Sequence, residues 1–207
     1  MDKIDSIMAR LGSYPIQLVS RRDPTELDLR AFEQELGGSL PFEYSVFLSQ
    51  YGQTALSRGA RFFIRESNPW GSKDSLDQFF GFSTDPSQDI VNLTMQTYAG
   101  RIPDETIPIG SDAGGNLILL GFDALVENQV FFWDHKHREL DGGRLADMAT
   151  ELESKGIDTC QLDAHSLIWH WEQTFPEQLV KPAGYSNVYA VANNFMEFLE
   201  SLQPEDI

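Results

Sequence analysis

Short apolar runs separated by turn residues in the middle of the chain limit its fold more than any other feature. Residues 107–110 read Ile-Pro-Ile-Gly, residues 117–120 are all apolar, and residues 130–133 read Val-Phe-Phe-Trp. Between the first two runs, residues 111–116 supply Asp, Gly and Asn, which tolerate the positive φ angles of a tight reversal. The pattern predicts a β-hairpin and then a strand that is covered on both faces.

Helical patterns precede this sheet. Apolar residues recur at helical spacing over residues 4–11, which predicts an amphipathic helix. Asp23-Pro24-Thr25-Glu26 is typical of a second helix start, with Asp23 as the cap, Pro24 as the first helical residue and Glu26 completing a capping box. This helix is expected to end at Gly37.

Further helical patterns lie on both sides of the sheet. They cover residues 41–51, 88–98, 145–152 and 191–202, and residues 61–65 add a short aromatic strand. Helices, then strands, then helices indicate the α+β class rather than alternating β/α units. We therefore expect an antiparallel, or mixed, sheet packed by N-terminal and C-terminal helices.

The charge of the chain restricts its partners. There are 32 Asp and Glu against 15 Lys and Arg, a formal net charge of −17. Such a field repels phosphate backbones and anionic lipids, so neither nucleic acid nor a membrane is expected as a partner. It would attract a basic protein and speed their encounter. The alternative is that acidity serves solubility alone.

The sequence also indicates a compartment. Cys160 is the only cysteine, so no intramolecular disulfide can form, which is typical of a reducing environment. The first residues lack the cationic start and apolar run of a signal peptide, and no apolar stretch reaches about 20 residues. We expect a cytoplasmic protein.

No motif for catalysis, metal binding or cofactor binding emerges. Asp134 and His135 adjoin in a predicted strand, so their side chains should point to opposite faces. His135 and His137 could share a metal ion, but no further ligand accompanies them. The Gly114-Gly115-Asn116 turn lacks the spacing of a phosphate-binding loop. The sequence predicts a non-enzymatic protein without metal or cofactor.

Several motifs, taken in order, resemble the SUKH superfamily, which joins yeast cell-wall assembly regulators with bacterial toxin-immunity proteins. An acidic helix ending in Leu36-Gly37 leads into a Leu40-Pro41 helix start. The aromatic segment Phe79-Phe80-Gly81-Phe82 follows. The most specific match is Ile107-Pro108-Ile109-Gly110, with Asp112, Gly114-Gly115-Asn116 and the strand that ends in Trp133-Asp134-His135.

The end of the chain carries a further match and one departure. Residues 191–199 are similar to the terminal Ala-x-x-Phe-x-x-Phe-Leu helix of the superfamily. Members usually pass quickly from Trp-Asp-His to that helix, whereas residues 136–189 intervene here. Either this segment is an insertion, or residues 145–152 are the true terminal helix. We expect residues 1–207 to form one SUKH-like domain, with 136–189 as its divergent part.

The resemblance implies a function in protein binding. We expect an immunity protein that neutralises a cognate toxin without catalysis. A basic nuclease would suit the net charge of −17. Its oligomeric state is left open. Residues expected to contact the partner, either in the matching motifs or in the turn of residues 68–71, are Trp70, Asp112, Asn116, Asp134 and His135. A regulatory scaffold of the same superfamily is the first alternative, and an unrecognised enzyme is the second.

Overall fold

A computed structural model describes residues 3–15, 20–66, 72–135, 142–162, 166–167, 170–171, 174–175, 185 and 187–205. The first part of the chain contains α1 (Lys3–Arg10), β1 (Ser13–Pro15), α2 (Glu26–Leu36), α3 (Phe42–Tyr51), β2 (Thr54–Phe63) and β3 (Lys73–Phe79). The remainder contains α4 (Ile90–Asn92), η1 (Leu93–Thr97), β4 (Thr106–Ser111), β5 (Leu117–Gly121), β6 (Val130–Trp133), α5 (Gly142–Ser154), β7 (Val188–Ala192), α7 (Phe195–Ser201) and β8 (Gln203–Pro204).

The strands form one sheet in the order β1-β2-β3-β4-β5-β6-β7, and β8 pairs with β2. All the strand pairs in the described residues are antiparallel. The backbone N–H of Arg65, just beyond β2, donates to the carbonyl of Ala190 on β7 over 2.9 Å. The sheet therefore curls until the end of β2 reaches its last strand. The predicted α+β class with an antiparallel sheet is confirmed.

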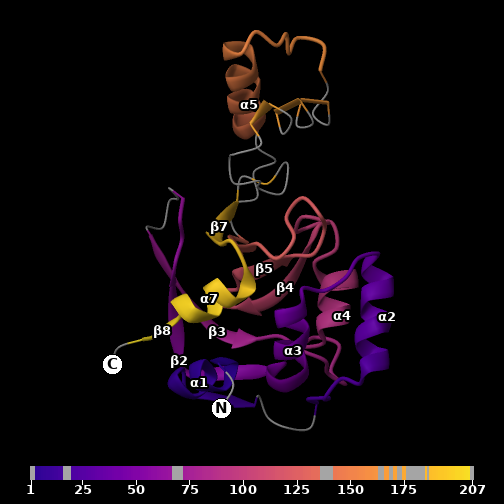
Figure 1. The fold of residues 1–207 in the computed structure, drawn as a ribbon, viewed down its shortest axis with the longest axis vertical. Helices are drawn as coiled ribbons and strands as arrows, with labels where there is room; N and C mark the ends of the chain where they lie inside the picture. The colour runs from indigo at the N-terminus through magenta and orange to yellow at the C-terminus, as the bar shows by residue number, and fades with distance from the viewer. Residues whose placement is uncertain are drawn as a thin grey trace.

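Helices from both ends of the chain cover the sheet. Figure 1 shows α7 lying across the strands, α1 below it, and α3, α4 and α2 following one another toward the right. The ring of Phe47 on α3 lies 4.7 Å from that of Phe79 on β3 and 5.1 Å from that of Phe195 on α7. Tyr44, one turn earlier on α3, also meets Phe195 at 5.1 Å. These edge-to-face contacts join three segments that lie far apart in the sequence.

The start of α2 differs from its predicted form. The helix begins at Glu26 and its cap is Thr25, whose hydroxyl accepts a hydrogen bond from the backbone N–H of Asp28 over 3.2 Å. The carboxylate of Asp28 in turn accepts a hydrogen bond from the backbone N–H of Thr25 over 2.8 Å, which completes the capping box. Asp23 was the predicted cap, but its carboxylate accepts from the guanidinium of Arg21.

The predicted helix over residues 191–202 is also divided. Val191 belongs to strand β7, whose five residues are all buried, and the helix α7 begins only at Phe195. Asn194 separates the two elements because its side chain caps α7, accepting from the N–H of Glu197 over 2.8 Å. Apolar residues on a fully buried strand followed directly by a helix thus imitate one amphipathic helix.

Helix α5 has an apolar cluster distinct from the main core. Met148 and Leu152 of α5 pack with Leu167 and Trp171, and the indole N–H of Trp171 donates to Glu151. Figure 1 shows α5 standing apart from the helices that cover the sheet. The predicted helix over residues 145–152 is confirmed as part of α5.

The aromatic contact at Phe47 gives a test of the fold. Replacing this fully buried ring by Phe47→Ala should lower the free energy of unfolding by about 3–5 kcal/mol, because a cavity opens where α3, β3 and α7 meet. Phe42→Ala is the matched control, since Phe42 lies on the same helix and is 77% exposed. Denaturant unfolding measures both, and equal effects would contradict the role of Phe47.

Candidate functional site

The hairpin turn between β4 and β5 is held by side-chain hydrogen bonds. The carboxylate of Asp112 accepts from the backbone N–H of Asn116 over 2.8 Å and from its side-chain amide over 2.7 Å. Gly115 has φ of +92°, a value that favours glycine. A Cβ built there would lie 3.7 Å from the ring of His135. The turn is therefore held by hydrogen bonds on one side, and its glycines are exposed.

Asn116 also connects this turn to the end of β6. Its side-chain oxygen accepts from the backbone N–H of His135 over 3.2 Å and lies 2.9 Å from the Nδ1 of the same residue. Because the amide oxygen can only accept, Nδ1 must carry the proton. Three of the predicted residues, Asp112, Asn116 and His135, thus form one hydrogen-bonded chain.

The remaining predicted residues are not part of this hydrogen-bonded chain as the structure describes it. Asp134 is 1% exposed. Its backbone N–H donates to the carbonyl of Asn187 over 2.9 Å, and the Asn187 side chain donates to its carbonyl over 2.7 Å. Asp134 is therefore buried at the end of β6, with its backbone held by Asn187. Trp70 and His137 fall outside the described residues.

Two carboxylates on β3, absent from the predicted set, complete an acidic cluster around this turn. Burial raises the pKa of Asp74, and the charges of Asp112, Asp134 and Asp77 raise it further. Burial likewise raises the pKa of Asp77, with additional effects from the charges of Asp112 and Glu205. We call these residues, Asp74, Asp77, Asp112, Asp134 and Glu205, the acidic cluster.

Hydrogen bonds offset part of this repulsion. The backbone N–H of Ser75 donates to Asp74 over 2.7 Å, which favours the ionised carboxylate. The backbone of Ala113 acts on Asp77 in the same way. In the part of the chain that is described, no Lys or Arg forms an ion pair with Asp74, Asp77 or Asp112. Like charges are thus held close together in the acidic cluster.

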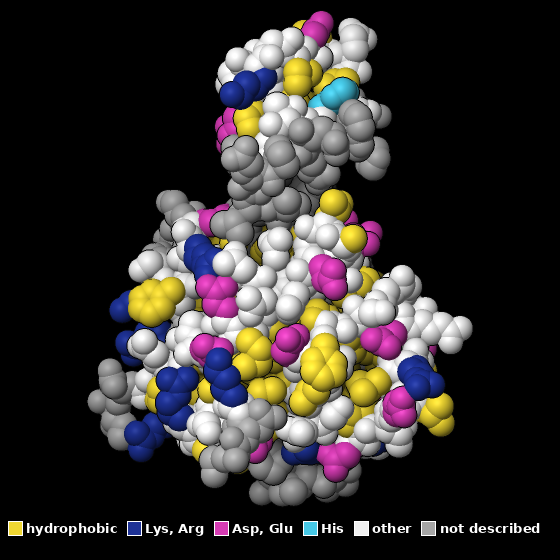
Figure 2. All heavy atoms as spheres, viewed as in Figure 1, with side chains coloured by type: hydrophobic (Ala, Val, Ile, Leu, Met, Phe, Trp, Pro, Cys, Tyr) yellow, Lys and Arg dark blue, Asp and Glu magenta, His cyan; other side chains and the backbone are white. Residues whose placement is uncertain are grey.

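Basic side chains are unevenly distributed over the surface. On the face drawn in Figure 2, most Lys and Arg side chains gather on the side of α1 and β2, and Asp and Glu are spread more widely. A hollow of about 200 Å³ lies at the edge of the acidic cluster. It is lined by Arg61 and Lys73 together with the cluster residues Asp74 and Glu205. The Nζ of Lys73 lies 5.0 Å from the ring centroid of Phe63.

The described residues show no group of three or more His, Cys, Asp or Glu side chains placed to hold a metal ion. Within the same residues, no helix has the length and apolar character needed to cross a membrane. The candidate site thus consists of a hairpin turn held by side-chain hydrogen bonds and of the acidic cluster around it.

With this architecture, the chain belongs to the SMI1 / KNR4 family (SUKH-1), whose model matches residues 23–152. The match runs from the start of α2 into α5 and includes the turn and the end of β6. The chain is 32% identical over 125 residues to the SPbeta prophage-derived uncharacterized protein YokK of Bacillus subtilis (strain 168). That alignment covers 54% of this chain and 62% of the relative, less than two thirds of its length. No solved structure gives a significant match.

Neutralising one carboxylate of the acidic cluster should stabilise the fold. Burial and neighbouring charges hold the pKa of Asp74 above its ordinary 3.8, so its ionised form costs more in the folded chain than in the unfolded chain. This cost is present above the raised pKa and disappears as the pH falls below the unfolded value. Asp74→Asn should raise Tm by about 1–3 °C near pH 7, a small gain because water screens a half-exposed group.

The same substitution should have no effect near pH 3, where Asp74 is protonated in both states. Asp147→Asn on α5 is the control, because it removes the same charge from an exposed position outside the cluster. Thermal unfolding at both pH values provides the measurement. A lower Tm for Asp74→Asn near pH 7 would show that the carboxylate stabilises the fold.

Proposed function

We propose that this protein is an immunity protein that binds a basic toxin and blocks it without catalysis. The observation that carries the proposal is the acidic cluster, in which carboxylates repel one another at a rigid surface and lack a basic ion-pair partner at Asp74, Asp77 and Asp112 among the described residues. A cation brought by a partner would relieve this repulsion, so binding would offset part of the unfavourable electrostatic free energy of the cluster.

Family membership and net charge support the same proposal. The SUKH resemblance implies toxin immunity for bacterial members, and a net charge of −17 would steer a positively charged protein toward the surface. A nuclease that binds anionic nucleic acid is basic in its substrate groove, so an acidic inhibitor can occupy that groove. The cytoplasm, where such a toxin would act, is the proposed compartment.

We further propose that residues 1–207 form one SUKH-like domain and that 136–189 is its divergent part. The pairing of β7 with β6 and the packing of α7 against α3 support a single core. The separate apolar cluster of α5 supports a different role for the intervening segment. Variable segments on a fixed scaffold commonly carry partner specificity.

Growth rescue provides the direct test of immunity. The product of the reading frame beside this gene is induced alone or together with this chain, and any complex is then captured by pull-down. We expect growth to be restored and a complex that weakens as salt is raised. Continued arrest with no co-purified toxin would contradict the proposal for that pair.

The acidic cluster should lower the stability of the free protein and strengthen its binding to a basic partner. Asp74→Asn/Asp77→Asn is expected to weaken the complex by about tenfold at low salt, mainly through slower association, while the free protein becomes more stable. A control, Glu43→Gln/Asp147→Asn, removes the same charge at exposed positions outside the cluster. Binding kinetics measure the difference, and equal losses in both variants would mean that only net charge matters.

A further inference from the structure

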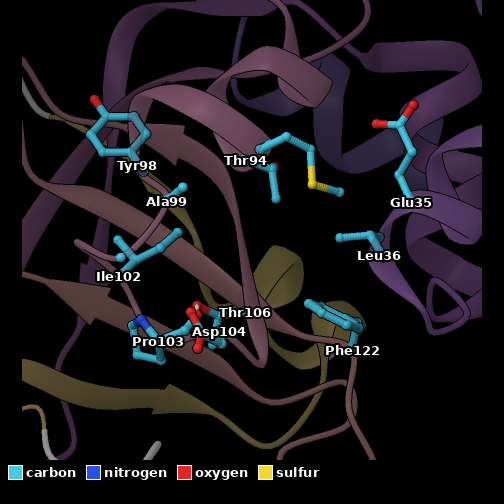
Figure 3. A pocket seen from close by; sticks show the side chains of 12 residues that line it. Glu35, Leu36, Thr94, Tyr98, Ala99, Ile102, Pro103, Asp104, Thr106 and Phe122 are labelled. Atoms are coloured by element: carbon cyan, nitrogen blue, oxygen red, sulfur yellow. Dashed lines mark hydrogen bonds between the residues drawn. The ribbon is translucent and has the colours of Figure 1, made fainter.

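A half-open cavity of about 180 Å³ lies between α2, η1 and the loop that follows η1. Figure 3 shows Leu36 of α2 and Phe122 on one side and Ile102 and Pro103 on the other. Pockets that hold drug-sized ligands usually measure about 300–1,000 Å³. This cavity is therefore better suited to one side chain of a partner protein than to a whole small molecule.

The charged residues at the cavity have one sign. Glu35 from α2 and Asp104 from the loop line it, and no Lys or Arg is among its lining residues. Both carboxylates are exposed, and neither has an ion-pair partner in the described parts of the chain. The nearby Arg101 instead lies against the rings of Tyr98 and Trp133, at 5.2 and 5.8 Å from their centroids.

The backbone at the cavity is also unusual. Thr94 and Met95 reach it from η1, where the helix widens into a π-helical turn over Leu93–Thr97. Such turns are rare and are found frequently at functional sites. Thr94 and Met95 line the same cavity as Leu36, so its wall combines polar and apolar groups while its charged groups are carboxylates.

We propose that this cavity receives a single Arg or Lys side chain of the protein partner. The aliphatic stem of such a residue would pack along Leu36, Ile102 and Phe122, and its cationic head would meet Glu35 or Asp104. A buried cationic anchor surrounded by apolar contacts is a common arrangement at the centre of protein interfaces. The inference rests on the proposed function, because it names how the partner is held.

The first test does not need the toxin. The full ¹⁵N-labelled chain is titrated with the peptide Ac-Gly-Arg-Gly-NH₂, and with Ac-Gly-Gln-Gly-NH₂ as the neutral comparison. We expect the Arg peptide alone to shift amide signals of residues 94–104 and their neighbours at Leu36 and Phe122. Shifts that scatter over the surface, or that are the same for both peptides, would overturn the proposal.

Variants distinguish the effect of the cavity carboxylates from the effect of net charge. Glu35→Gln/Asp104→Asn should weaken peptide binding by about fivefold or more, whereas the control Glu43→Gln/Asp147→Asn, with the same change of charge, should leave it nearly unchanged. Ala99→Tyr provides a second variant, which obstructs the cavity without changing charge. If the control loses as much affinity as the cavity variant, the proposal fails.

Growth rescue then distinguishes the two proposals. If the unmodified chain rescues growth and Glu35→Gln/Asp104→Asn rescues equally well with unchanged affinity for the toxin, immunity stands and the cavity is not the anchor. If the unmodified chain gives no rescue, the proposed function fails for that pair. The peptide titration then still decides whether the cavity accepts a cationic side chain.

Discussion

The contact of Phe47 with Phe79 and Phe195 is the constraint on which the rest of the structure depends. It fastens helices from both ends of the chain onto the strand β3, through ring separations of 4.7 and 5.1 Å. Once α7 is fixed, β7 immediately before it lies along β6. Asn187, at the start of β7, then holds the backbone of Asp134. The geometry of the acidic cluster thus follows from an aromatic contact in the core.

The cluster itself is unfavourable for folding. Burial and the charges of neighbouring carboxylates raise the pKa values of Asp74 and Asp77 on β3, and stability would increase if these two groups were neutral. Proteins tolerate such local conflicts mainly at functional sites, where the surrounding fold supplies the stability that the site lacks. In this chain the surrounding fold is the curled sheet with its aromatic core. Under the proposed function, a basic partner would offset the electrostatic cost on binding.

Sequence patterns predicted the elements whose signals are local. The hairpin of β4 and β5 was predicted because its turn residues and apolar runs are adjacent, and β6 because its run is uninterrupted. Strand β3 was missed, since its buried residues Leu76 and Phe79 are three positions apart and the residues between them are polar. That spacing resembles a helix more than a half-buried strand.

The candidate site was predicted only in part for a similar reason. Asp112, Asn116 and His135 belong to motifs that can be recognised in the sequence, and the structure joins them by hydrogen bonds. Asp74 and Asp77 reach the same place only through the pairing of β3 with β4. The cavity beside α2 depends on a π-helical turn and on three segments that are separate in sequence. Neither the acidic cluster nor the cavity could be predicted from neighbouring residues in the sequence.

Hydrogen exchange on the complex tests the central claim most directly. The chain is bound to the toxin that it protects against in the growth-rescue test, and the exchange of its backbone amides is compared with that of the free protein. The account predicts slower exchange along β3 and in the turn between β4 and β5, where the acidic cluster lies. Protection confined to other surfaces, with these segments unchanged, would contradict the claim that the acidic cluster binds the partner.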